Sequence, residues 1–188
     1  MSFIKENRKL LVKMTVTLFA ITAAATLLLA GVQALTEPNI AENARIKTAA
    51  AMEQIVPGGE FTPEPVSISD DATLYGVTKG GAPAGYCVLV APVGFKAEIS
   101  MIVGVGTGGE VLGVAIISMT ETAGLGTRAQ DPEFLAQYEG LSGDIQLGAG
   151  DGKVDALTGA TVTSKAVTLG VNTALTAVKH YELGGASS

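Results

Sequence analysis

Residues 98–118 read EISMIVGVGTGGEVLGVAIIS, and this stretch decides the fold. Two apolar runs rich in Val and Ile, Glu98–Val105 and Glu110–Ser118, flank a glycine turn at 107–109. Runs of this length joined by so short a turn are typical of a β-hairpin, and they predict an antiparallel sheet. Residues 104–109 also match GxGxxG, but a dinucleotide fingerprint needs a helix after the turn, and here another strand-like run follows. We therefore interpret the match as a hairpin turn.

The segments on either side extend the sheet and then add helices. Strand-like runs at Thr73–Thr78 and Gly85–Ala91 precede the hairpin. Asp131–Tyr138 predicts a short helix with proline in its first turn, and Thr163–Tyr181 predicts a longer helix that ends at a Gly-Gly pair. The apolar residues of one face of this longer helix are Val167, Val171, Ala174, Leu175 and Val178. Strands followed by helices in separate blocks predict an α+β fold, an antiparallel sheet flanked by helices.

Composition excludes several classes of protein. The 188 residues include one Cys, which excludes a disulfide scaffold and any Cys-cluster metal or iron–sulfur site within this chain, and one His, which disfavours a multi-His metal site. A net charge of −6 argues against nucleic-acid binding. We interpret Cys87 as a core residue of an apolar strand and His180 as a partly exposed residue near a helix end. Three carboxylates are interpreted as a solvated helix face without an acid–base role: Asp131, Glu133 and Glu139.

The charge is divided between a short leader and the rest of the chain. Residues 1–35 carry a net charge of +3 and residues 36–188 carry −9. Residues 14–32 form an uncharged run whose threonines can bond back to helix carbonyls, and a helix of this length spans about 28 Å. The run is longer than the apolar region of a secretory signal peptide, so a retained anchor is favoured over a cleaved signal ending near Ala34. The positive-inside rule then leaves the N-terminus in the cytoplasm and the acidic body outside it.

A second helix is expected directly after the anchor. Pro38 suits the first turn of a helix that runs from Asn39 to Ile55, and Pro57-Gly58-Gly59 would stop it. The sequence thus divides into a basic cytoplasmic leader (1–13), a transmembrane helix (14–33), a stalk helix (34–58) and the α+β domain (59–188).

Two polar, glycine-containing segments stand out from this scaffold. Thr120–Arg128 is a loop after an apolar strand, and its glycines allow a ligand to approach the backbone. Asp155–Ser164 crowds small residues and hydroxyls at the start of the last helix. One hydroxyl suffices as a helix cap, whereas the group together suits an anion held by free backbone N–H groups.

These two segments resemble the motifs of extracytoplasmic FMN-binding domains. Asp155–Thr161 reads DALTGAT, which resembles the D-x-x-[S/T]-G-A-T flavinylation motif of that family. Glu121–Gly126 reads ETAGLG and resembles the family's E-T-P-G-L-G segment, with Ala123 in place of the usual proline. The anchor, the stalk helix and the strands at Gly85-Tyr86 and Gly94–Val105 follow in the family's order.

The resemblance implies that Thr161 is joined through a phosphoester to FMN by a separate flavin transferase that uses FAD. It places the Glu121–Gly126 loop beside the isoalloxazine and the phosphate at the helix start, where Lys165 would pair with it. The implied cofactor-binding residues are Glu121, Thr122, Gly124, Leu125, Gly126, Asp155, Thr158, Gly159, Ala160, Thr163, Ser164 and Lys165.

Two membrane complexes use a protein of this kind: the Rnf ferredoxin:NAD oxidoreductase and the sodium-pumping NADH:quinone reductase. The compact chain favours the Rnf type. The resemblance therefore implies an electron carrier of the inner membrane that is not catalytic alone and whose partners are the other Rnf subunits. The alternatives are the equivalent member of the quinone reductase and an anchored interaction module without redox function.

Overall fold

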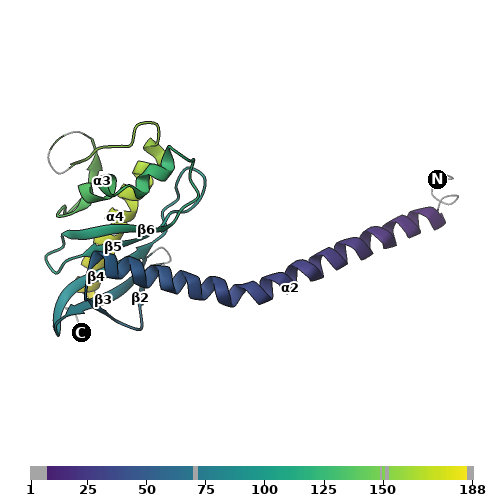
Figure 1. The fold of residues 1–188 in the computed structure, drawn as a ribbon, viewed down its shortest axis with the longest axis horizontal. Helices are drawn as coiled ribbons and strands as arrows, with labels where there is room; N and C mark the ends of the chain where they lie inside the picture. The colour runs from purple at the N-terminus through teal and green to yellow at the C-terminus, as the bar shows by residue number, and fades with distance from the viewer. Residues whose placement is uncertain (1–7, 70–71, 149, 151–152, 186–188) are drawn as a thin grey trace. The chain divides into compact units, whose positions relative to one another are not determined.

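A computed structural model describes residues 8–69, 72–148, 150 and 153–185 of the chain (Figure 1). By their internal contacts, residues 1–46 and 47–188 form two compact units. The described part of the first unit, residues 8–46, lies within helix α2 (Arg8–Ile55), and the second unit contains the sheet and the other helices.

The hairpin at 98–118 is confirmed, and it forms one edge of an antiparallel sheet. β5 (Ser100–Val105) pairs with β6 (Val111–Ser118), so that Val103 lies opposite Val114. The turn between them is closed by the Gly106 N–H, which donates to the Glu110 carbonyl. Gly109 has a φ of +81°, a conformation that favours glycine.

The remaining strands extend the sheet on the β5 side. The main path of the six-stranded sheet runs β1-β3-β4-β5-β6, and β2 pairs with β3 beside β1. These strands are β1 (Glu60–Phe61), β2 (Val66–Ser69), β3 (Ala72–Lys79) and β4 (Ala82–Val90). A parallel pair of two-residue strands, β7 (Gln146–Leu147) and β8 (Lys153–Val154), lies outside it.

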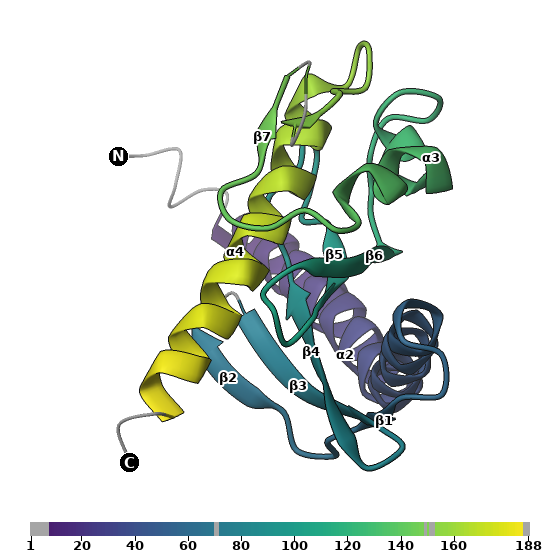
Figure 2. The same cartoon turned by 90° about the vertical axis from the view of Figure 1, so that its left-hand side faces the viewer.

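Helix α4 (Thr161–Gly185) lies across one face of the sheet and forms the larger core (Figure 2). The predicted apolar face of this helix is confirmed, because Val167, Val171, Ala174, Leu175 and Val178 are all buried. They pack with inward-facing strand residues such as Val88, Met101 and Val103. Apolar burial of this kind stabilises the fold by about 25 cal/mol for each Å² removed from water.

A smaller core lies on the other face of the sheet. The last turns of α2 bury Ala51 and Met52 against Val77, Cys87 and Ile102. The end of α2, from Lys47 onward, thus packs as part of the second compact unit.

Two expected helix boundaries differ from the structure. α2 continues through Pro38. The proline removes one hydrogen bond of the helix and crowds the preceding turn, whereas the alanine-rich sequence around it favours helix. The segment at 131–138 is divided into α3 (Pro132–Leu135) and the 3₁₀ turn η2 (Ala136–Tyr138). So short a segment makes too few hydrogen bonds to hold one regular α-helix.

Within the described part of α2, Val12–Gln33 is long and apolar enough to cross a membrane, with a mean hydropathy of 2.0. The hydroxyls of Thr17, Thr22 and Thr26 donate to carbonyls one turn earlier, as expected. The anchor itself and the four-part division of the chain remain predictions.

Candidate functional site

The two polar segments singled out in the sequence meet in one groove. The groove has a volume of about 370 Å³ and lies between the 121–126 loop and the start of α4. Its size is within the range of roughly 300–1,000 Å³ found for small-molecule sites. It is lined by Phe95, Glu121, Thr122, Leu125, Gly126, Gly159, Ala160, Thr161, Val162 and Thr163.

Glu121 connects three parts of this groove. Its side chain is buried, at 8% exposure. Oε1 accepts hydrogen bonds from the backbone N–H groups of Phe95 (2.9 Å) and Lys96 (3.2 Å). Oε2 accepts a hydrogen bond of 2.8 Å from the Thr163 hydroxyl on α4. Both oxygens of the carboxylate thus have hydrogen-bond partners within the chain.

Glycines make room for this carboxylate. A Cβ on Gly94 would lie 2.5 Å from Glu121 Oε1, and a Cβ on Gly126 would lie 2.7 Å from Oε2. Gly126 is also the first residue of the 3₁₀ turn η1 (Gly126–Gln130). Both positions therefore require glycine for close packing around the carboxylate.

The first turn of α4 presents free donors to the groove. Ser164 N–H donates to the Ala160 carbonyl, and Ala160 N–H donates to Leu157. Among the described residues, the backbone N–H groups of Thr161, Val162 and Thr163 have no hydrogen-bond acceptor, as is usual at a helix start. The positive end of a 25-residue helix together with three free amides favours an anion here.

The four hydroxyls near this turn differ in their contacts. Thr163 and Ser164 are buried, and each uses its one proton: Thr163 donates to Glu121 and Ser164 to the Ala160 carbonyl. Thr158 is exposed and does not line the groove. Thr161 is exposed, lines the groove and makes no side-chain hydrogen bond within the described residues.

Several residues implied by the resemblance lie outside the groove lining. Gly124 has a φ of +73° in the turn that shapes the loop, and Lys165 is exposed in the first turn of α4. Asp155 is exposed and its backbone N–H is bonded to the Gln137 side chain. Ser164 serves as an internal cap, since its Oγ also accepts the Leu157 N–H at 3.0 Å.

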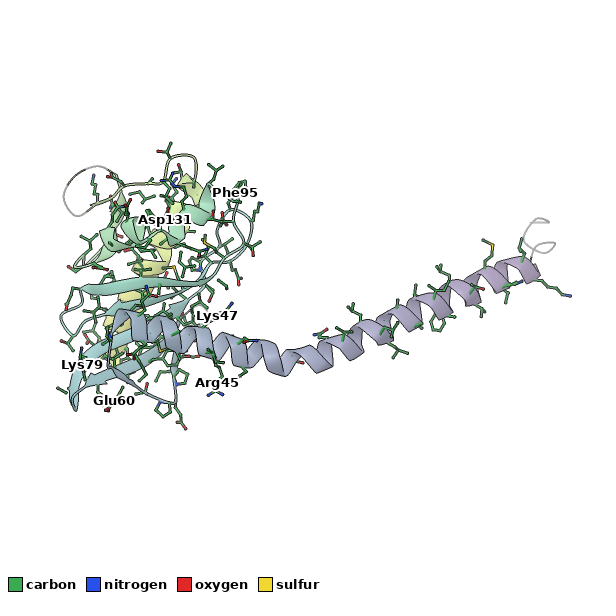
Figure 3. The ribbon with its side chains drawn as sticks, viewed as in Figure 1. Arg45, Lys47, Glu60, Lys79, Phe95 and Asp131 are labelled. Carbon is green, nitrogen blue, oxygen red and sulfur yellow. The ribbon has the colours of Figure 1, made fainter. Side chains whose placement is uncertain are left out.

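Phe95 is a site residue that the sequence reasoning missed. It is 65% exposed and lies at the end of the domain opposite Lys79 and Glu60 (Figure 3). Its position depends on a turn in which Gly94 N–H donates to the Ala97 carbonyl. In the sequence, Phe95 is an aromatic residue in a turn that also contains Pro92 and Gly94. No local sequence pattern links that turn to residue 121.

The residues that the sequence analysis interpreted as structural lie in the core or on the surface, outside the groove lining. Cys87 is buried, and desolvation raises the pKa of its thiol to about 12. His180 is exposed, and Asp131 lies 3.8 Å from Arg128 on the surface. Within the described ranges, no group of three or more His, Cys, Asp or Glu residues is arranged to hold a metal ion.

A larger cavity lies away from both motifs. It measures about 460 Å³ and is bordered by the 107–109 turn, Asp144 and the C-terminal half of α4. Its Asn172 amide is occupied on both sides by the backbone of Ile145, at 3.0 and 2.8 Å. The Thr161 hydroxyl and the free amides at the start of α4 lie instead at the smaller groove.

Comparison with known proteins identifies two regions of the chain. Residues 1–55 match the RnfG N-terminal region, and residues 94–176 match the FMN-binding domain. The second match contains every residue of the groove lining.

Whole-length relatives extend the match. The chain is 31% identical over 186 residues to the G subunit of the Na⁺-translocating ferredoxin:NAD⁺ oxidoreductase complex of Acetobacterium woodii, covering 87% of this chain and 89% of that one. It is 32% identical to the G subunit of the ion-translocating oxidoreductase complex of Methanosarcina acetivorans, covering 94% and 99%.

Among solved structures, NqrC of Shewanella oneidensis is 21% identical, with a TM-score of 0.47 over 62% of this chain and 63% of that one. The identities and coverage of the two G subunits, together with the match at residues 1–55, decide the family. The chain belongs to the RnfG family of ion-translocating oxidoreductase complexes, and its groove lies in the FMN-binding domain of that family.

Proposed function

We propose that this chain carries electrons on an FMN joined covalently through a phosphoester to Thr161. The observation that carries the proposal is the state of the Thr161 hydroxyl, which is exposed in the groove at the start of α4, while the hydroxyls of Thr163 and Ser164 are buried and bonded.

The residues of the groove fit an FMN group. An ester at Thr161 would put a phosphate beside the free amides of residues 161–163. Lys165 follows one helical turn later and would add a positive charge near that phosphate. Phe95, Leu125 and Val162 offer exposed apolar surface of the kind that packs against a flat ring, being 65%, 44% and 51% exposed.

FMN, when bound, supplies redox chemistry by one or two electrons, and the protein's part is to hold and orient it. Attachment would require the Thr161 hydroxyl to lose its proton as its oxygen bonds to the FMN phosphorus of FAD and AMP leaves. Threonine is a weak nucleophile without a base. Because Glu121 is committed to three donors, we assign that base to the separate flavin transferase.

We propose that this electron carrier works within an Rnf complex of the inner membrane. Residues 14–33 would anchor it as a single span, with the leader 1–13 in the cytoplasm and the domain outside. Its partners would be the membrane and peripheral subunits of the complex. The groove residues hold and orient a cofactor, so we assign the chain electron transfer within the complex and no separate reaction.

Mass spectrometry of the full chain, purified from cells that contain a flavin transferase, tests the proposal. We expect the peptide containing Thr161 to carry the mass of FMN less one water, and we expect Thr161→Ala to lack it. Thr161→Ser keeps a hydroxyl at the same place and serves as the matched control, which should remain modified.

An unmodified Thr161 peptide in such cells would contradict the proposal and favour an anchored interaction module. A flavin that persists in Thr161→Ala would move the attachment to Thr158 or another hydroxyl. Copurification with quinone-reductase proteins instead of Rnf proteins would favour the related complex.

A further inference from the structure

The Glu121 carboxylate joins segments that are distant in the sequence. It bonds to the backbone of Phe95 and Lys96, which precede it by 26 and 25 residues. It also bonds to Thr163, which follows it by 42 residues. These bonds connect one wall of the groove, the Phe95 turn, with the helix turn that presents Thr161.

The surroundings of the carboxylate are built for this connection. Gly94 and Gly126 leave no room for a Cβ on either side of it. In the described part of the chain, no buried side-chain nitrogen or oxygen atom lacks a hydrogen-bond partner, and this includes the carboxylate of Glu121. Both oxygens therefore have partners within the chain before any cofactor arrives, so the carboxylate joins these segments without a ligand.

We propose that Glu121 is a positioning residue of the groove: it fixes the Phe95 turn to the first turn of α4 and so sets the geometry of the wall facing Thr161. Part of this inference rests on the proposed function, because the wall matters for an FMN at Thr161. The three hydrogen bonds of Glu121 that form this tether are present in the chain without flavin.

Two substitutions separate the hydrogen bonds of the Glu121 side chain from its negative charge. Glu121→Gln retains one oxygen that accepts from the Phe95 and Lys96 amides, and its NH₂ can donate to a rotated Thr163 hydroxyl. Glu121→Ala removes all three bonds. A positioning role therefore predicts that Gln rescues what Ala loses.

Hydrogen exchange on the full-length chain, produced without a flavin transferase, measures the tether directly. We expect the amides of Phe95 and Lys96 to exchange at least tenfold faster in Glu121→Ala and to stay within about threefold of the parent chain in Glu121→Gln. Glu98→Gln is the matched control, because Glu98 is an exposed acid in the same turn and its loss should change neither amide.

The flavin provides the second measurement. In flavin-loaded chain, the visible circular dichroism of the attached FMN should weaken in Glu121→Ala and persist in Glu121→Gln and Glu98→Gln. Thr163→Val removes only the tether to α4, so it should weaken the signal less than Glu121→Ala while the Phe95 and Lys96 amides stay protected. It also provides a folded variant if Glu121→Ala does not fold.

The two proposals fail in different ways. Parent-like exchange of both amides in Glu121→Ala, or a Gln variant that behaves like the Ala variant, would overturn the positioning role while the Thr161 flavin remained. Absence of flavin with the exchange pattern intact would overturn the proposed function and leave the tether in place.

Discussion

At the scale of single residues, hydrogen bonding distinguishes Thr161 from Thr163 and Ser164. Four hydroxyls lie within seven residues of sequence, and composition alone treats them alike. Thr163 and Ser164 are buried and donate to Glu121 and Ala160. A hydroxyl has one proton to donate, so neither is free to bond a phosphate as a donor. The motif predicted Thr161, and the bonding of its neighbours gives the prediction a physical basis.

The turn that contains Ala123 has a geometry that suits proline at that position. Leu125 N–H donates to the Thr122 carbonyl at 3.1 Å, and Gly124 has a φ of +73°. This arrangement is typical of a type II turn, which needs a positive φ at its third residue and favours proline at its second. Ala123 occupies that second position, and within the described residues its N–H makes no hydrogen bond.

We therefore expect Ala123→Pro to raise the free energy of unfolding by about 0.4–1 kcal/mol, because proline restricts the unfolded chain without removing a bond. Ala123→Gly should lower it by a similar amount. Urea unfolding followed by circular dichroism measures both. A proline variant that unfolds at lower urea would show that φ at residue 123 does not suit proline.

At the scale of elements, the end of α2 stabilises the domain by packing. Met52 is 3% exposed and lies in the smaller core with Val77 and Cys87. Ile46 is on the same helix but 57% exposed. We expect Met52→Ala to lower the free energy of unfolding of the detergent-solubilised chain by about 2–5 kcal/mol, through lost burial and a cavity.

Ile46→Ala is the matched control, since it truncates an apolar side chain of the same helix without leaving a cavity. Its effect should stay within about 0.5 kcal/mol. Equal effects of the two variants in denaturant unfolding would mean that the end of α2 does not belong to the domain's core.

The elements that the sequence predicted are those with a strong local pattern. The apolar runs at β3 to β6 and the buried stripe of α4 carry their own periodicity, and all five are present. Two-residue strands such as β1 and β7 carry none. The Phe95 turn was missed for a related reason: its partner Glu121 is 26 residues away, and only the folded sheet brings the two together.

At the scale of the whole molecule, buried acids predict loss of stability at alkaline pH. Burial raises the pKa of Cys87 from 9.0 and that of Tyr138 from 10.0, in each case to about 12. The Tyr138 hydroxyl also bonds to Thr168 at 2.8 Å, which opposes part of that rise. Between about pH 9 and 12 the unfolded chain loses protons that the folded chain keeps, so the free energy of unfolding falls as pH rises.

The thiol contributes first, because its unfolded pKa is the lower of the two. While the thiol is ionised in the unfolded chain and neutral in the folded chain, the free energy of unfolding falls by about 1.4 kcal/mol per pH unit. We expect Cys87→Ala to be less stable at pH 7 but to lose stability less steeply between pH 9 and 10.5. Urea unfolding at several pH values gives the slopes, and identical slopes would contradict a neutral buried thiol.

The opposite net charges of the leader and the domain predict how the chain is oriented across the membrane. The leader is positive and the domain acidic, so the positive-inside rule puts Lys9 in the cytoplasm and Lys79 outside it. Cys87 is buried and its thiol neutral, which leaves the native chain unreactive toward a charged maleimide and permits single added cysteines. Both lysines are exposed.

An impermeant maleimide applied to intact spheroplasts should label Lys79→Cys and leave Lys9→Cys unlabelled until the membrane is permeabilised. The reverse pattern would invert the proposed orientation and place Thr161 in the cytoplasm. A mature chain that lacks the Lys9 peptide by intact mass would indicate a cleaved signal and remove the anchor. Labelling reports directly on which side of the membrane residue 79 lies. The span expected at Val12–Gln33 ends before the domain begins, so Thr161 lies on the same side as residue 79.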